Sequence, residues 1–294
     1  MHRHHLTRVV APALGVLALV SLASCSSDDK KADDTTTTKI ETTTTAASGE
    51  SAATVAFDKE IQQELIDVIF EALEWMGLDW DEQPVLQSTR FDAHQEAVDR
   101  LLSSGRAYWS DPVPESERDR TGGRPYDPAD RDRDLGPGDG RAVRFRTPDD
   151  GTTSWVDLIR GDISFENANI EDFVIRRADG SPTFFVANAV DDQDMAVTHV
   201  IRGDDHLNNA ARQTLIYQAM DWAVPAFAHI PLIHGPDGAK LSKRHGAVSV
   251  LQYEEEGYLP DALLNYLVRL GWSHGDQEVF TREEMIALFD IGDV

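Results

Sequence analysis

Apolar positions recur at helical spacing in two stretches of the first third of the chain. DKEIQQELIDVIFEALEWMG (58–77) predicts a helix that ends at Gly77, and TRFDAHQEAVDRLLSSG (89–105) predicts another, closed by Gly105. The first has Ile61, Leu65, Val68, Ile69, Ala72, Leu73 and Met76 at the apolar positions, and the second has Val98, Leu101 and Leu102 on one face. Both patterns indicate ordinary amphipathic packing, with order beginning near Ala56.

The pattern then changes to one typical of strands. RAVRFRT (141–147) alternates, and SWVDLIRGDISFE (154–166) predicts two strands around a turn at 160–162. DFVIRRADGSPTFFVANAVDD (172–192) predicts a strand, an Asp-Gly turn and an apolar segment. VTHVIRGDDHL (197–207) predicts an apolar strand before a helix over 206–222. Strands that alternate with helices favour an α/β sheet, in which ligands bind beyond the carboxyl ends of the strands, where Arg202 stands.

For two charged segments the pattern alone indicates a structural role rather than a binding site. Residues 110–140 are rich in Asp, Arg, Pro and Gly, which predicts a surface loop with solvated charges. Asp204, Asp205 and His206 could be metal ligands or a helix cap. Three adjacent side chains point in different directions and rarely bind one ion together, so we expect Asp204 or Asp205 to cap the helix that follows.

The N-terminal segment has a different composition from the rest. Basic residues precede an apolar run over 9–23, and the end of this run forms the sequence Leu22-Ala23-Ser24-Cys25. The run is too short for an ordinary spanning helix and fits a secretory signal, residues 1–25, of the kind in which Cys25 is acylated. Residues 26–56 are rich in Thr, Ser, Asp and Ala, which predicts a flexible linker.

Charge and cysteine content limit the function classes. The 294 residues carry a formal net charge of −25, which argues against general nucleic-acid binding by bulk charge but allows a local basic groove. Cys25 is the only cysteine, so an intramolecular disulfide and a multi-cysteine zinc site are both excluded.

Four blocks resemble one family, the bacterial glutamyl-tRNA synthetases, which are class I aminoacyl-tRNA synthetases. They are FEALEWMGLDWDEQPVLQSTR, THVIRGDDHLNNAARQ, FAHIPLIHGPDGAKLSKRHGAVSV and GYLPDALLNYLVRLGWSHGDQEVF. The resemblance runs from about Ile66 to Val294 and is weakest over 110–140. It implies activation of glutamate by ATP, with Mg²⁺, and transfer of the aminoacyl group to tRNA.

The resemblance also implies roles for particular residues. KLSKR, residues 240–244, matches the second class I signature, so Lys240, Leu241, Ser242, Lys243 and Arg244 would bind ATP. Lys243 would contact the phosphates, Lys240 and Arg244 would support it, and Gly238 and Gly246 would let the loop move. The alternative is a solvated basic turn.

Three further residues would bind glutamate. Arg202 matches an arginine that pairs with the amino acid, since a guanidinium can fork onto a carboxylate. Its alternative is a structural ion pair with Asp204 or Asp205. Asn188 matches a polar substrate contact, or is a turn or packing residue. Phe184 stands where many members have tyrosine, so it keeps the wall of the site and lacks the hydroxyl.

The implied fold is an incomplete Rossmann-like α/β catalytic domain. Residues 57–106 would be the remnant of the first half of this domain, and residues 180–250 its second half. Between them, residues 107–179 would form an inserted α+β domain that binds the tRNA acceptor stem. Residues 251–294 would form a truncated helical stem-contact region. Phosphate contacts in the insert are expected from arginines such as Arg144, Arg146 and Arg160. Some relatives hold zinc in the insert, and without cysteine we expect none.

The sequence departs from the family at both ends. The first class I signature, a strand, a glycine-rich turn and His-x-Gly-His, does not occur in residues 1–65. We also expect the anticodon-reading part of the family to be missing. We therefore expect impaired activity, poor stability or rescue by a partner, and a junction between two genes near 55–65. The synthetase part is expected in the cytoplasm. The alternatives are a membrane-anchored lipoprotein with a catalytically dead binding module, and a remnant that grips tRNA without chemistry.

Overall fold

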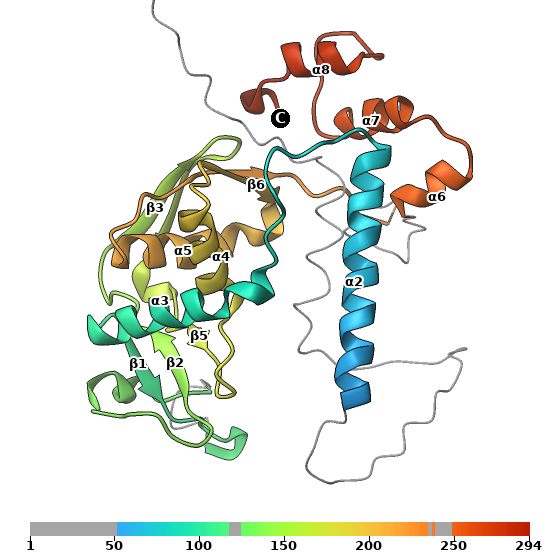
Figure 1. Ribbon diagram of the computed structural model, residues 1–294. Coiled ribbons are helices and arrows are strands. Elements are labelled where there is room, and N and C mark those ends of the chain that lie inside the picture. The colour runs from blue at the N-terminus through green and yellow to red at the C-terminus, as the bar shows by residue number, and fades with distance from the viewer. Residues whose placement is uncertain (1–51, 118–124, 235–236, 239–248) are drawn as a thin grey trace, which may run out of the picture.

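The computed structural model describes residues 52–117, 125–234, 237–238 and 249–294 (Figure 1). The α-helices are α2 (Ala52–Trp75), α3 (Phe91–Ser103), α4 (Phe184–Asp194), α5 (Leu207–Ala219), α6 (Val250–Glu255), α7 (Pro260–Val268) and α8 (Arg282–Leu288). The strands are β1 (Ala107–Ser110), β2 (Ala142–Phe145), β3 (Thr152–Asp157), β4 (Gly161–Glu166), β5 (Val174–Arg176), β6 (His199–Gly203) and β7 (Ala226–Ile230). Short 3-10 turns are η2 (Gln87–Arg90), η4 (Pro128–Asp132), η5 (Asn167–Asn169), η6 (Asp204–His206) and η8 (Ile291–Asp293).

The described strands form three small sheets. β1, β2 and β5 make an antiparallel sheet in the order β1-β2-β5, β3 and β4 make a hairpin, and β6 and β7 pair in parallel. The predicted hairpin is confirmed, with Asp157 opposite Gly161, so its turn lies at 158–160. The apolar segment after the Asp-Gly turn is the helix α4. The fold is mixed α/β, as expected.

One large hydrophobic core lies among α3, α4, α5 and the sheets. Val98 and Leu101 of α3 are fully buried there, which confirms the predicted apolar face of that helix. Tyr217 of α5 and Phe227 of β7 are buried in the same cluster. Each such side chain contributes roughly 1.5–3 kcal/mol through burial, so this core fixes the ends of β6 and β7.

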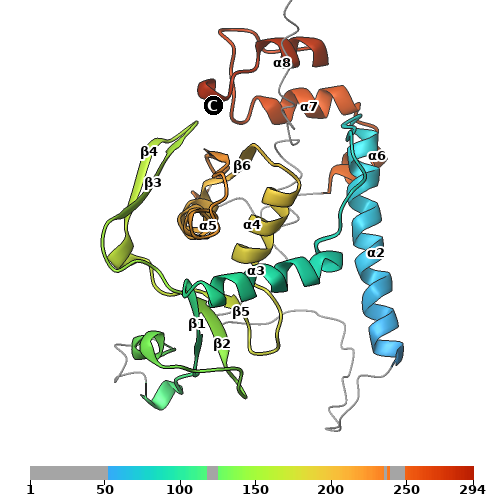
Figure 2. The same ribbon diagram turned by 60° about the vertical axis from the view of Figure 1, so that its left-hand side comes forward.

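The long helix α2 stands beside this body (Figures 1 and 2). Its C-terminal end packs through Ala72 and Met76 on Val250 of α6 and Leu263 of α7. Gly77 follows with a φ of 62°, which confirms the predicted stop. The predicted apolar face is wrong further up the helix, because Leu65 is 60% exposed and Val68 44% exposed. Over residues 63–75, the part of α2 whose exposure is described, only Ala72 is buried.

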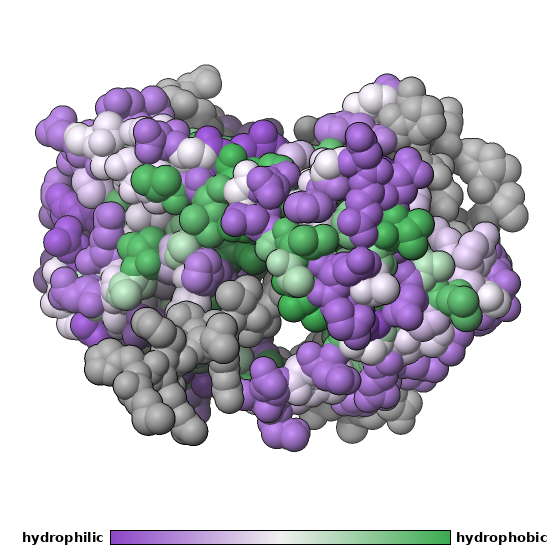
Figure 3. All heavy atoms as spheres, turned by 90° about the horizontal axis from the view of Figure 1, so that it is seen from above, coloured by the Kyte–Doolittle hydropathy of each residue, from purple (hydrophilic) through white to green (hydrophobic). Residues whose placement is uncertain are grey.

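Several apolar side chains in and beside the C-terminal helices α7 and α8 lie at the surface. Leu259, Val279 and Ile286 are all more than 70% exposed. Seen from above, apolar side chains lie in patches among hydrophilic ones (Figure 3).

The prediction of a solvated loop over 110–140 is wrong for its second half. Asp130 is fully buried in η4, and its Oδ2 accepts from the backbone N–H of Asp111 at 2.9 Å. Arg131 reaches Asp172, which is also buried, through Nε and Nη2. Charges in this segment therefore tie η4 to the β1-β2-β5 sheet rather than facing water.

The turn of the β3-β4 hairpin is fastened to β7. The backbone N–H of Leu158 donates to the carbonyl of Phe227 at 2.8 Å. Asp157, at the end of β3, accepts from the backbone N–H of His229 at 3.0 Å. Two segments about 70 residues apart in sequence are thereby joined beside the parallel pair.

Candidate functional site

Arg202 lies near the carboxyl end of β6, directly opposite His229 of β7. Its Nε donates to Nε2 of His229 at 3.2 Å, and its guanidinium carbon lies 5.4 Å from the ring centre of Phe227. Its Nη2 is buried and has no hydrogen-bond partner among the described residues. A buried charged donor without a partner is costly, so this nitrogen is suited to a bound anion.

His229 is held in turn by a buried carboxylate. Its Nδ1 lies 2.6 Å from Oδ2 of Asp157, and both side chains are fully buried. Burial by itself would raise the pKa of Asp157, but hydrogen bonds from His229 and from backbone N–H groups outweigh it, so the pKa is lowered. Burial lowers the pKa of His229. The pair is therefore an ionised carboxylate and a neutral imidazole at neutral pH.

The charge of Arg202 persists despite its burial. Burial lowers the pKa of Arg202 to about 10, and attraction to Asp192 and other acidic groups partly opposes this effect. Asp192 is half-buried, desolvation raises its pKa, and it accepts from the hydroxyl of Tyr217 at 2.8 Å. Arg202 is therefore still positively charged at neutral pH.

Helix α4 brings the other predicted glutamate contacts to one face. Phe184, Asn188 and Asp192 are spaced four apart, so they lie along one side of the helix. The ring of Phe184 is 6.1 Å from that of His206, just beyond β6. Asn188 accepts from Nε2 of Gln87 at 3.0 Å. Arg202 and Phe184 therefore flank the same strand end, while Asn188 has a protein partner.

The turn after β6 corrects the predicted helix cap. Neither Asp204 nor Asp205 caps α5: both lie in the 3-10 turn η6, and the residue at the N-cap of α5 is His206. Asp204 instead pairs with Arg160 from the hairpin turn. Among the residues that the structure describes, no three His, Cys, Asp or Glu side chains come together as possible metal ligands.

The three arginines expected to bind phosphate differ in their surroundings. Arg144 is buried, stacks 3.9 Å over the ring of Tyr126, and donates to the carbonyl of Asp172 at 2.7 Å. Its role as a phosphate contact is therefore wrong, since it lies inside the insert. The side chains of Arg146 and Arg160 are about 40% exposed.

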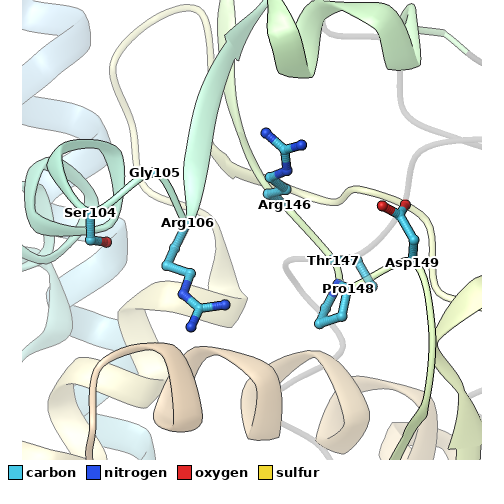
Figure 4. Close-up of a pocket in the computed structure, with 7 residues that line it drawn as sticks. All are labelled: Ser104, Gly105, Arg106, Arg146, Thr147, Pro148 and Asp149. Carbon is cyan, nitrogen blue, oxygen red and sulfur yellow. The ribbon is translucent and has the colours of Figure 1, made fainter.

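A pocket of about 400 Å³ lies beside Arg146 (Figure 4). Ser104, Gly105, Arg106, Arg146, Thr147, Pro148 and Asp149 line it. The side chains of Arg106 and Arg146 point in opposite directions in this pocket. They do not converge on one anion, and none of the predicted glutamate contacts lies here.

Several predicted site residues fall outside the described residues. They are Cys25, Lys240, Leu241, Ser242, Lys243 and Arg244. Gly238, just before them, is described and has a φ of 75°, a conformation that favours glycine.

Comparison with known proteins decides the family. Residues 58–293 match the model of tRNA synthetases class I (E and Q), catalytic domain. The chain belongs to this family. A glutamate–tRNA ligase of Caulobacter vibrioides is 56% identical over 236 residues, which are 78% of this chain and 50% of that protein. One from Syntrophobacter fumaroxidans is 53% identical over 236 residues, with the same coverage.

Solved structures agree with this membership of the class I synthetases. A glutamate tRNA ligase from Elizabethkingia meningosepticum, crystallised in complex with its amino acid, matches with a TM-score of 0.66 and 33% identity. The match covers 77% of this chain and 55% of that one. The chain spans about half the length of the curated relatives that it matches.

Sequence reasoning missed four residues around Arg202. They are Asp157, Asp192, Tyr217 and His229. One signal was available: His229 interrupts the apolar run of AFAHI, and a polar side chain inside a buried strand needs a partner. The identity of that partner, 72 residues away, is not visible in the sequence.

Proposed function

We propose that this chain is the catalytic part of a glutamate–tRNA ligase, which activates glutamate with ATP and transfers it to tRNA. The observation that carries the proposal is Arg202, a buried cation with an unpartnered Nη2 at the carboxyl end of a parallel strand. The names of relatives above 50% identity support glutamate as the substrate.

Arg202 would bind a carboxylate of glutamate. Its planar guanidinium can donate two parallel hydrogen bonds, and burial strengthens them because water does not compete. Phe184 would form a wall of the site beside His206. Asn188 would contribute a polar contact through its amide nitrogen, since its oxygen already accepts from Gln87.

The loop of residues 240–244 would hold ATP. Lys240, Leu241, Ser242, Lys243 and Arg244 are the matching positions, and Lys243 would contact the phosphates. In the reaction a carboxylate oxygen of glutamate attacks the α-phosphate and pyrophosphate leaves. Charge grows on the phosphates as this happens, so positioned cations lower the barrier, and Mg²⁺ would enter bound to ATP.

The insert over 107–179 would bind the tRNA acceptor stem, between the catalytic parts over 57–106 and 180–250. Arg146 and Arg160 remain candidates for phosphate contacts, because their guanidinium groups reach the surface. The helices over 251–294 would begin the stem-contact region.

Glutamate-dependent exchange of pyrophosphate into ATP tests the proposal, measured with and without tRNA. We expect Lys243→Ala to abolish any exchange, whereas Arg269→Ala, which removes an exposed arginine 3.7 Å from Glu278, should leave it unchanged. Exchange that persists in Lys243→Ala would refute the assignment. Salt-dependent tRNA retention without exchange would instead indicate a binding remnant.

A second proposal concerns residues 1–25. The apolar run that ends in Leu22-Ala23-Ser24-Cys25 supports a lipoprotein signal in which Cys25 is acylated. The lipid would anchor the chain to a membrane, with residues 26–56 as the linker. The synthetase part would then be an impaired binding module. None of the helices within the described part of the chain is long and apolar enough to cross a bilayer. Mass spectrometry of the N-terminal peptide, compared with Cys25→Ser, tests this. An unmodified chain in the soluble fraction would favour a cytoplasmic enzyme.

A further inference from the structure

We infer that His229 is a positioning residue that aims the guanidinium of Arg202 at the bound carboxylate, and that Asp157 sets its tautomer. The inference rests on the proposed function, because it names the support of the same glutamate site. It assigns a role to two fully buried residues, of which His229 contacts Arg202 and Asp157 contacts His229.

The tautomer follows from the hydrogen bonds on either side of the ring. Asp157 is ionised and can only accept, so the proton of His229 lies on Nδ1, which faces Oδ2 of Asp157 at 2.6 Å. Nε2 then carries a lone pair and accepts from Nε of Arg202 at 3.2 Å. The opposite tautomer would place two N–H groups face to face.

This bond fixes the direction of the rest of the guanidinium. The group is planar, so holding Nε and stacking the plane near Phe227 leaves little freedom for Nη2. Asp192 on α4 attracts Arg202 but makes no ion pair with it within 4 Å. Among the described residues, His229 is therefore the hydrogen-bonded anchor of Arg202.

Burial favours an imidazole that stays neutral, and it lowers the pKa of His229. Asp157 on β3 acts in the opposite direction, whereas Arg202 on β6 and His206 on η6 also favour the neutral ring. A proton on Nε2 would remove the acceptor and set a second positive charge beside Arg202. Positioning of Arg202 therefore requires the neutral ring.

Asp157→Asn tests the inference with little change in shape. Oδ1 of Asp157 accepts from the backbone N–H groups of Ile159, Arg160 and His229, and the amide oxygen of asparagine can keep all three bonds. Its NH₂ then faces Nδ1 of His229 and donates to it, which moves the ring proton to Nε2. The shape is kept, and what changes is the tautomer of His229 together with the loss of one carboxylate charge that attracts Arg202.

We expect the full-length Asp157→Asn chain to bind glutamate about 10-fold more weakly, since one charge-assisted contact is misaligned. Equilibrium dialysis with radiolabelled L-glutamate measures this, and a urea unfolding midpoint close to that of the wild type shows that the fold is kept. In the ¹⁵N-histidine-labelled protein, the ring shifts of His229 should report a proton on Nδ1 in the wild type and on Nε2 in the variant.

His229→Gln and His229→Leu form the matched pair. Glutamine offers a donor for Asp157 and an acceptor for Arg202 about as far apart as the two ring nitrogens, so we expect glutamate affinity within about threefold of wild type. Leucine has neither group and should bind at least as weakly as Asp157→Asn. A purely structural role would instead make affinity follow the unfolding midpoint in all three variants.

The outcomes separate this inference from the proposed function. A wild type that binds glutamate and an Asp157→Asn chain that binds it equally well would overturn the role of His229 alone. A wild-type ring proton on Nε2 would overturn it too. A wild type that binds no glutamate would remove the proposed function, and the positioning role with it.

Discussion

Arg131 is anchored by the buried carboxylate of Asp172, whereas Arg202 is anchored by the buried imidazole of His229. Arg131 gives Nε and Nη2 to Asp172, Nη1 to Asp149 and a further bond from Nη2 to the carbonyl of Thr147. Arg202 gives Nε to His229 and keeps a buried Nη2 without a partner among the described residues. Hydrogen bonds to Asp172 raise the pKa of Arg131, whereas burial lowers that of Arg202.

The difference separates a structural arginine from a binding one. Every nitrogen of Arg131 is used inside the protein, so it joins η4 to the insert and has little left for a ligand. Arg202 is held at one nitrogen and open at another, which is the condition for binding an anion without rearrangement. Burial with unsatisfied bonding, rather than positive charge alone, therefore marks the functional arginine.

The largest effect should come from Asp172→Ala. It leaves the half-buried Arg131 without its main partner and also removes the fully buried acceptor of the Tyr108 hydroxyl at 2.5 Å. Breaking a buried pair in this way costs about 3–5 kcal/mol of unfolding free energy. Urea unfolding measures it. Asp149→Ala, at the exposed end of the same arginine, is the control and should change the free energy by less than about 1 kcal/mol.

Arg202→Met should reverse this pattern. Methionine keeps most of the packing over Phe227 and removes a buried charge, so the unfolding free energy should change by about 1 kcal/mol or less. Glutamate-dependent ATP–pyrophosphate exchange should fall about 100-fold or more, because a charge-assisted fork to the carboxylate is lost. A large loss of stability with normal exchange would mean that Arg202 is structural like Arg131.

The Arg202 region should also be sensitive to acid. The folded pKa of His229 lies below its ordinary value of 6.5, so the unfolded chain takes up this proton first as the pH falls. The stability from neutral His229 is therefore complete above pH 6.5 and is lost below it, at up to about 1.4 kcal/mol per pH unit. Comparing urea midpoints at neutral and mildly acidic pH measures it. In His229→Gln this part of the slope should vanish.

The smallest effect belongs to Tyr126→Phe in the Arg131 region. The change removes the hydroxyl that accepts from the backbone N–H of Asp172 at 3.1 Å and keeps the ring beneath Arg144. One net hydrogen bond is worth about 1 kcal/mol, so the urea midpoint should drop slightly. Exchange activity should not change, and a change would mean that the two regions are coupled.

Local pattern predicted the elements better than it predicted the site. Helix α3 with its stop at Gly105, and the β3-β4 hairpin, follow from spacing and glycine position, since both are short-range properties. Arg144 was misassigned because its burial depends on Tyr126, which lies on a distant loop. The support of Arg202 was missed for the same reason: Asp157 and His229 meet only through the tertiary fold.

The fastening of the hairpin turn to β7 has a consequence for assembly. Along the outer edge of β7 the carbonyl of Phe227 accepts a hydrogen bond from the N–H of Leu158. The N–H of His229 donates a hydrogen bond to the carboxylate of Asp157. An edge strand with open groups is a template for strand addition by another molecule. Here the turn occupies those groups, so concentrated solutions of the protein should resist strand-by-strand aggregation at this edge.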